Sequence, residues 1–115
     1  MAAKVASWQI LSKNPDASSK FYAETFGWSV STSNPLGYRE LRSGSSGGVD
    51  GGVWPCPPEG HPMVQLFIHT DDLERTMDRA VGGGAKVIIP VQVLPQGERM
   101  AVLLDPEGIP FGLMS

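Results

Sequence analysis

Apolar and polar residues alternate in short stretches along the first half of the chain, with one longer stretch of helical character among them. Asn14 followed by Pro15 is a typical helix start, because Asn caps free amides of the first turn and Pro fits the first helical position. Gly27 is a typical helix end. The inward stripe of this helix is predicted to comprise Ala17, Phe21, Tyr22, Thr25 and Phe26. Strands are predicted around the helix at residues 5–11, 28–31, 38–42 and 49–54.

The second half of the chain repeats this order of elements. A strand is predicted at residues 63–69, and Asp71 and Glu74 after it have the N-cap and N3 spacing of a capping box. The glycines at 82–84 end this second helix. Its inward stripe is predicted to comprise Leu73, Met77, Ala80 and Val81. Three more strands are predicted at residues 86–89, 100–104 and 109–114.

A strand, a helix and three strands therefore occur twice, which indicates an internal repeat. Aligned on their helices, the two halves place Ser7 at the position of Gln65, with negligible sequence identity. A chance repeat stays open, because such units are common, and a ferredoxin-like βαββαβ domain is the main competing fold. We expect a single domain of residues 1–115, with modules at 1–54 and 63–115 joined by a linker at 55–62.

Composition and charge narrow the classes of partner. The chain has 115 residues, of which 41% are hydrophobic, and a net charge of −3 without a Lys or Arg cluster, so we expect a globular protein that binds neither nucleic acid nor a membrane surface. The absence of a long apolar run or a signal-like N-terminus favours a cytoplasmic location. Cys56 has no second cysteine for a disulfide and no adjacent basic residue to activate it.

Four short motifs occur in register over nearly the whole chain. They are FYAETFGW at residues 21–28, TDDL at 70–73, GGAKV at 83–87 and DPEG at 105–108. Together they resemble motifs of the vicinal oxygen chelate (VOC) family, which includes glyoxalases, bleomycin-resistance proteins and dioxygenases. The resemblance implies an α+β fold in which two βαβββ modules form a cup-shaped mixed sheet, with the functional site inside the cup. It also implies a homodimer.

The resemblance further implies where a metal would bind in metal-using members of the family. Four His, Gln or Glu ligands come from the first and last strands of each module. Carried over to this chain, these positions are Ser7, Gln65, Gly112 and one residue within 51–54. Only Gln65 carries a ligand-type side chain, and a single amide is insufficient for a stable metal site. We therefore predict no metal and no cofactor.

Alternation along the strands suggests which residues face the cup. Ser7 and Gln9 share one face of their strand, whereas Trp8 and Ile10 face the helix. The predicted ligand-binding residues are Ser7, Gln9, Trp54, Gln65, Phe67 and Met100. The alternative interpretation is that they form a hydrogen-bonded polar patch inside a closed or dimer-buried sheet.

Three functions stay open at this point. The first is a module that binds a small organic molecule in a cup lacking a complete metal site. The second is a VOC-type lyase, isomerase or dioxygenase, metal-dependent or using a carboxylate base, for which Glu40 and Glu98 are the first candidates; His69 is more typical of an exposed residue at a helix start. The third is a domain whose cup is filled by another protein. No catalytic residue is assigned.

Overall fold

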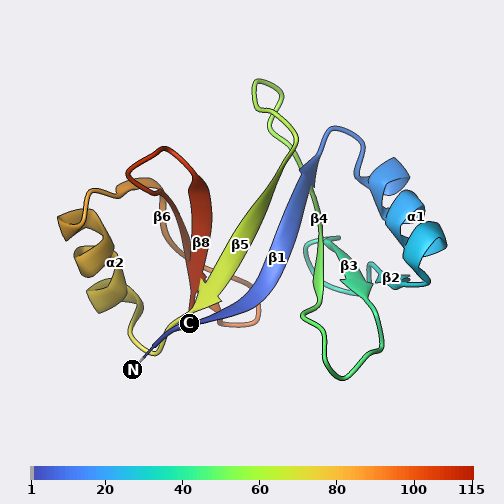
Figure 1. Cartoon of the computed structure of the whole chain (residues 1–115), viewed down its shortest axis with the longest axis horizontal. Helices are drawn as coiled ribbons and strands as arrows, with labels where there is room; N and C mark the ends of the chain where they lie inside the picture. The colour runs from blue at the N-terminus through green and yellow to red at the C-terminus, as the bar shows by residue number, and fades with distance from the viewer. Residues whose placement is uncertain (1) are drawn as a thin grey trace. The chain divides into compact units, whose positions relative to one another are not determined.

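The computed structural model describes residues 2–115, which group into two compact units (Figure 1). The first unit is Ser7–Gln65. The second unit is Leu66–Ser115 together with the N-terminal residues up to Ala6. Each unit contains one helix and strands with both parallel and antiparallel neighbours. Within the described residues, no helix is long and apolar enough to cross a membrane.

The order of elements confirms the predicted α+β fold with two βαβββ modules. The first module has β1 (Lys4–Ser12), α1 (Pro15–Phe26), β2 (Ser29–Ser31), β3 (Arg39–Arg42) and β4 (Gly51–Pro55). The second has β5 (Met63–His69), α2 (Leu73–Gly82), β6 (Lys86–Val93), β7 (Arg99–Leu104) and β8 (Pro110–Met114). Three strands follow each helix, so the competing βαββαβ fold is wrong.

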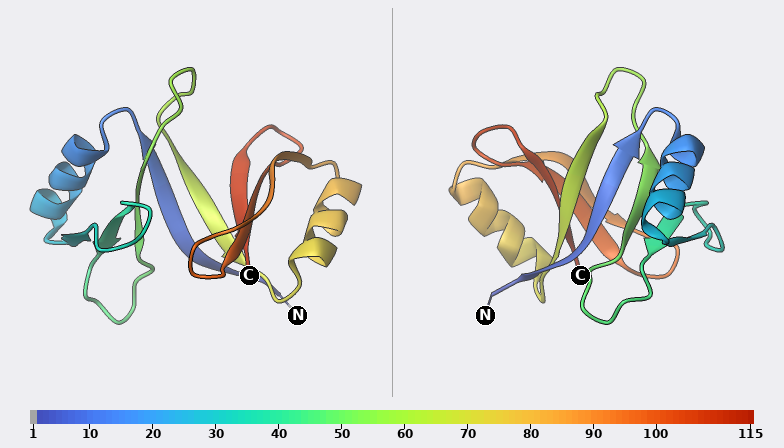
Figure 2. Two further views of the ribbon diagram at one scale, coloured as in Figure 1. Left: turned by 180° about the vertical axis from the view of Figure 1, so that it is seen from behind. Right: turned by 45° about the vertical axis from the view of Figure 1, so that its right-hand side comes forward.

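The strands of the first unit run in the order β2-β3-β4-β1. β1 and β4 are parallel, with Gln9 opposite Gly52, while β3 is antiparallel to both β2 and β4. Helix α1 contacts β2, β3 and β4, which lie beside it in both views of Figure 2. Leu41 and Val53 are the fully buried apolar residues between these elements.

The second unit has the same connectivity, in the strand order β5-β8-β7-β6. β5 and β8 are parallel, with Phe67 opposite Gly112, which repeats the pairing of β1 with β4. Its core cluster consists of Leu73, Ala85, Ala101, Leu103 and Leu113. Strand β6 is longer than predicted, because its pairing with β7 continues through register shifts past Ile89.

The two modules build their helix starts with the same side-chain hydrogen bonds. In the first, the hydroxyls of Ser12 and Ser18 lie 2.6 Å apart, and in the second those of Thr70 and Thr76 lie 2.7 Å apart. Each pair joins the end of β1, or the residue directly after β5, to a helix residue six positions further along the chain. The same hydrogen bond at equivalent positions of both modules favours an internal repeat over a chance similarity of the two halves.

The caps of the two helices correspond as well. The Asn14 side chain accepts from the amide of Ala17 at 3.2 Å, and the Asp72 side chain accepts from the amide of Arg75 at 3.1 Å. The predicted cap at Asp71 was therefore wrong by one residue. Asp72 has the extended backbone of an N-cap, with φ −136° and ψ 95°.

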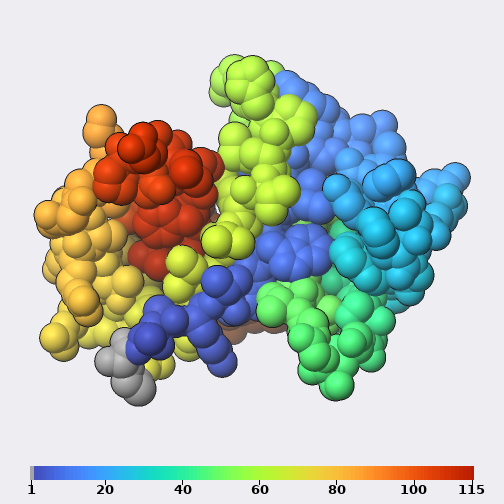
Figure 3. Space-filling view, viewed as in Figure 1, coloured from blue at the N-terminus to red at the C-terminus, as the bar shows by residue number. Residues whose placement is uncertain are grey.

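The inward stripe predicted for α1 is mostly wrong, because four of its five residues are exposed and only Tyr22 is half-buried. The side chains of Phe21 and Phe26 are 57% and 56% exposed, and the buried residue of this helix is Ser19. Small serines let α1 lie close to the sheet, while Tyr22 stacks on Trp28 at 6.0 Å. The outer surface of α1 is open at the right of Figure 3.

The stripe predicted for α2 agrees better with the structure. Leu73 is buried, and Met77 and Ala80 pack against the core of the second unit. Val81 is half exposed and was wrongly included.

Candidate functional site

Strand β1 presents different side chains to the two faces of the first unit, as predicted. Trp8 faces the helix side, where its ring lies 5.7 Å from that of Trp28. Ile10 also lies on that side, in a hollow that it shares with Tyr22. Ser7 lies on the opposite face, in a different hollow beside Tyr38.

Strand β3 extends this opposite face with alternating residues. Arg39 and Leu41 point to the helix side, where Arg39 pairs with Asp16 of α1 at 2.8 Å and Leu41 is buried. The residues between and beside them line a hollow of about 310 Å³ on the other side. Its lining consists of Ser7, Tyr38, Glu40, Arg42, Asp50 and Gly51. We term this surface, together with Gln9 and Trp54, the Tyr38 face.

Tyr38 and Trp54 are the half-buried aromatic residues of this face. The Tyr38 side chain lies at its centre, over Gly52. Its ring meets that of Trp54 edge-on at a centroid distance of 5.4 Å. The pKa of its phenol is raised to about 12, mainly by burial and additionally by the nearby Glu40 carboxylate, which disfavours a second negative charge, while a hydrogen bond from the Ser7 side chain partly offsets both effects. The phenol is therefore neutral at physiological pH and can donate a hydrogen bond.

Two carboxylates and one guanidinium surround the hollow. Glu40 pairs with Arg42 at 2.7 Å, and the exposed Arg42 side chain reaches the hollow from the end of β3. Asp50 accepts a hydrogen bond from the amide of Ser43 at 3.2 Å, which ties together the two ends of the loop between β3 and β4. The charged groups of the hollow therefore have a net charge of −1 when all are ionised.

The family resemblance places one metal-ligand position within residues 51–54. The pairing of β1 with β4 assigns this position to Gly52. Gln9 pairs with Gly52 as Phe67 pairs with Gly112, so Gly52 and Gly112 are equivalent residues of the two last strands. Both are glycines whose missing side chain is replaced by an aromatic group. A Cβ on Gly52 would overlap the phenol of Tyr38, and a Cβ on Gly112 would lie 2.6 Å from ring carbons of Phe67.

The donor set does not fit the metal ion of the metal-using members. Ser7, Gly52 and Gly112 offer no ligand-type side chain, and the amide nitrogen of the buried Gln65 contacts the sulfur of Met63 at 3.9 Å. Among residues 2–115, no three His, Cys, Asp or Glu side chains form a group that could hold a metal.

The predicted ligand-binding residues are divided between the two units. Ser7, Gln9, Trp54 and Gln65 belong to the first unit. Phe67 and Met100 belong to the second, where Phe67 covers Gly112 and Met100 pairs with Met114 across β7 and β8.

Other residues of the Tyr38 face were missed from the sequence. Glu40 was considered as a base and not as a ligand-binding residue of the cup, and Tyr38, Arg42 and Asp50 were not selected. Alternation with the buried Leu41 would have placed Tyr38, Glu40 and Arg42 on one face. Glu98, the other carboxylate considered, is exposed in the turn between β6 and β7.

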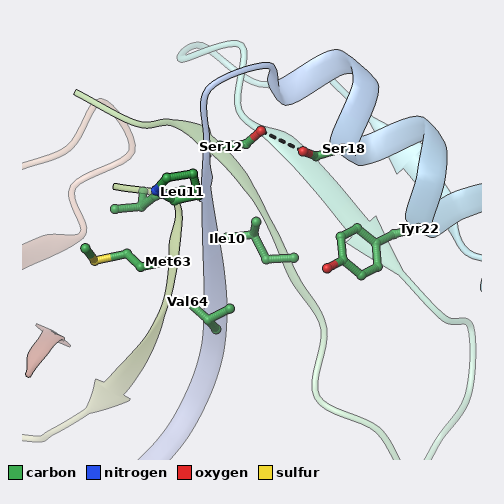
Figure 4. A pocket seen from close by; sticks show the side chains of 8 residues that line it. Ile10, Leu11, Ser12, Ser18, Tyr22, Met63 and Val64 are labelled. Carbon is green, nitrogen blue, oxygen red and sulfur yellow. Dashed lines mark hydrogen bonds between the residues drawn. The ribbon is translucent and has the colours of Figure 1, made fainter. Parts of the chain in front are cut away.

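A second hollow lies on the helix side of β1 in the first unit. Figure 4 shows Ile10 and Tyr22 on either side of it, below the hydrogen-bonded hydroxyls of Ser12 and Ser18. It measures about 320 Å³ and carries no charged side chain in its lining. The hydroxyls of Ser12 and Ser18 are already hydrogen-bonded to each other. This hollow therefore offers a ligand fewer polar groups than the Tyr38 face.

Comparison with known proteins agrees with this fold. Residues 9–114 match the glyoxalase-like domain family. The chain is 31% identical over 103 residues to "Putative glyoxylase CFP32" of Mycobacterium tuberculosis (strain CDC 1551 / Oshkosh) and equally to that of Mycobacterium bovis. The match covers 84% of this chain and 40% of either relative, so the chain spans well under half the length of these relatives.

Solved structures share the fold at low sequence identity. A hypothetical protein from Bacillus halodurans C-125 is 13% identical with a TM-score of 0.72, over 99% of this chain and 94% of its own. A glyoxalase/bleomycin resistance protein/dioxygenase superfamily member from Vibrio splendidus 12B01 is 15% identical with a TM-score of 0.67, over 98% of both chains. A Streptomyces coelicolor methylmalonyl-CoA epimerase variant, solved with 2-nitronate-propionyl-CoA, is 18% identical with a TM-score of 0.64, over 99% and 97%. With its paired βαβββ modules and its match over residues 9–114, the chain belongs to the glyoxalase-like domain family of the VOC superfamily.

Proposed function

We propose that this chain binds a small organic molecule on the Tyr38 face without using a metal ion. The observation that carries the proposal is the hollow of about 310 Å³, which combines a neutral phenol, charged groups and, through Tyr38, contact with the Trp54 ring. Small-molecule sites typically combine apolar or aromatic walls with a few polar groups that fix orientation. The glycines at the two last-strand positions favour binding without a metal over metal-assisted chemistry.

A ligand screen with Trp54 as the reporter tests this proposal. Aromatic and heteroaromatic compounds are titrated while tryptophan fluorescence and the melting temperature are followed. We expect at least one compound to raise the melting temperature, because ligands that bind only the folded state stabilise it. The fluorescence response should be lost in Trp54→Phe and kept in Trp28→Phe, which alters a tryptophan on the helix side. No response from any compound would contradict the proposal.

A second candidate function is an enzyme that uses Glu40 as a base. The observation in its favour is that the Glu40 carboxylate lines the same hollow, paired with Arg42 at 2.7 Å. Carbonyl compounds that bind would then exchange the hydrogen next to the carbonyl with deuterium from D2O in a protein-dependent manner. Glu40→Gln should abolish exchange and keep binding, with Glu98→Gln as the matched control. Binding without exchange favours the binding function.

Metal analysis separates both functions from a metal-dependent lyase, isomerase or dioxygenase. Protein purified without a chelator should contain far less than one equivalent of zinc, nickel, iron or manganese, because Gln65 alone cannot hold an ion. A stoichiometric metal that is lost in Gln65→Ala would contradict this expectation and favour a metal-dependent enzyme.

A further inference from the structure

The Tyr38 phenol lies in the space that a side chain at position 52 would occupy. A Cβ built on Gly52 would overlap both the hydroxyl oxygen and the adjoining ring carbon of Tyr38. Gly52 is paired with Gln9 on one side and with Glu40 on the other, so it lies in the middle of the sheet. A polar group from the residue directly before β3 therefore lies where the last strand of the first module would carry its own functional side chain.

The surroundings of the phenol suit hydrogen bonding to a bound molecule. Tyr38 lines the open hollow together with Ser7, and its ring lies edge-on against that of Trp54 at a centroid distance of 5.4 Å. This contact fixes the ring, and the small Gly52 leaves room for the hydroxyl. The raised pKa, about 12, keeps the proton on the oxygen, so that the group can donate a hydrogen bond to a ligand.

The charges of the hollow restrict the kind of acceptor. Glu40 and Asp50 are both acidic, and the single guanidinium, that of Arg42, is already paired with Glu40. A ligand carboxylate would meet repulsion that a neutral carbonyl would not. The Tyr38 ring, with the Trp54 ring edge-on against it, offers an apolar aromatic surface for the rest of the molecule.

We propose that Tyr38 donates the hydrogen bond that orients the ligand, and that the ligand is a neutral molecule with a carbonyl oxygen next to an aromatic or other planar group. This inference rests on the proposed function, because it assigns a ligand class to the same hollow. In this arrangement a phenol proton polarises the ligand oxygen, a task for which a positioned hydrogen-bond donor suffices.

Three simple probes test the ligand class: acetophenone, ethylbenzene, which replaces its carbonyl by a methylene, and benzoate, which carries a charge. Binding is measured by changes in backbone amide NMR signals, which detect weak ligands. Acetophenone should bind more tightly than the other two and shift the signals of residues 38 and 52. Glu40→Gln combined with Asp50→Asn should improve the binding of benzoate most, and no improvement would overturn the charge argument.

Tyr38→Phe keeps the ring and removes the hydroxyl. It should weaken acetophenone by roughly two- to tenfold, the range of one neutral hydrogen bond, and leave ethylbenzene unchanged. Tyr22→Phe, which removes the hydroxyl of the tyrosine on the helix side, is the matched control and should change neither. Equal weakening of acetophenone and ethylbenzene, or no weakening of either, would overturn the role of Tyr38.

A measurement that keeps the phenol in place covers the case in which Tyr38→Phe fails to fold. Incorporating 3-fluorotyrosine into Tyr22→Phe alters only Tyr38 and makes its hydroxyl a stronger donor. Acetophenone should then bind more tightly relative to ethylbenzene, and an unchanged ratio would contradict the inference. If no probe shifts signals of the Tyr38 face, the proposed function itself fails; if probes bind there with unchanged selectivity, only the role of Tyr38 fails.

Discussion

At the scale of single residues, Gly52 and Gly112 must be glycines because an aromatic side chain lies directly over each of them. Neither Gly52 nor Gly112 has a positive φ, so backbone freedom does not explain them. The reason is steric: a side chain would overlap Tyr38 at one site and Phe67 at the other. Both lie in the last strand of a module, at equivalent places in the parallel pairing with the first strand.

Replacing Gly112 by Ala should destabilise the protein. The new methyl group would lie 2.6 Å from ring carbons of the buried Phe67, and overpacking of this kind costs about 1–3 kcal/mol. Chemical denaturation measures the loss. In a Phe67→Ala background the same change should cost little, because the overlapping ring is gone. Gly47→Ala, with nothing within 4 Å of its Cβ, is the control.

The pKa of Tyr38 predicts a pH dependence of stability. Its folded-state pKa of about 12 lies above the model-compound value of 10.0, so the folded protein holds this proton more tightly than the unfolded chain. The resulting stabilisation is complete below about pH 10 and is lost as the pH rises toward 12. In Tyr22→Phe protein, phenolate absorbance should titrate near 12 and shift down in Glu40→Gln. Titration near 10 in both variants would contradict the assignment.

At the scale of elements, each helix start carries the same short framework of polar side chains. An Asn or Asp cap holds the first turn, and a pair of hydroxyls joins the strand end to the second turn. The amides of a helix start have no partners within the helix, so these side chains supply what the backbone lacks. Because the same caps and hydroxyl pairs occur in both modules, they are the strongest structural evidence for the internal repeat.

Removing either cap should cost about 1 kcal/mol of stability, the typical value for an N-cap replaced by alanine. Asn14→Ala removes the acceptor for the Ala17 amide, and Asp72→Ala removes the acceptor for Arg75. Thermal and chemical denaturation measure both. Asp71→Ala is the matched control, since it neighbours Asp72 without capping the helix. An effect at Asp71 as large as at Asp72 would show that α2 begins one residue earlier than described.

At the scale of the whole molecule, exposed apolar side chains favour self-association. Leu113 offers no surface for such an interface, since it is only 2% exposed and belongs to the core of the second unit. Large apolar side chains of the first unit are exposed elsewhere, above all Val64 at 62% and Phe21 at 57%. Contiguous exposed apolar surface is typical of protein interfaces.

We therefore expect a homodimer in solution, with the first unit contributing to its interface. Light scattering at micromolar concentration should give twice the chain mass. Phe21→Glu combined with Val64→Glu should yield monomers, whereas Val93→Glu, at an exposed position of β6, should leave the dimer intact. A wild-type protein that stays monomeric over the accessible concentration range would contradict the prediction.

Local features of the sequence determined the elements of this protein. Helix α1 begins after the cap Asn14 and ends at Gly27, which has a positive φ of 73°, as predicted. Both ends could be predicted because capping depends only on neighbouring residues. Strand β5 spans the predicted Met63–His69, since alternation is read within one strand. The alignment of Ser7 with Gln65 also superposes Ser12 on Thr70, and these two residues make equivalent hydroxyl pairs with their helices.

The tertiary structure alone decided which residues meet. The outward position of Phe21 and the burial of Ser19 depend on how closely α1 approaches the sheet, which helical periodicity does not encode. Tyr38 reaches Gly52 because β3 and β4 pair in one register across a long loop. A shift of one residue would turn Tyr38 to the other face, so the candidate site follows from long-range strand pairing rather than from any local motif.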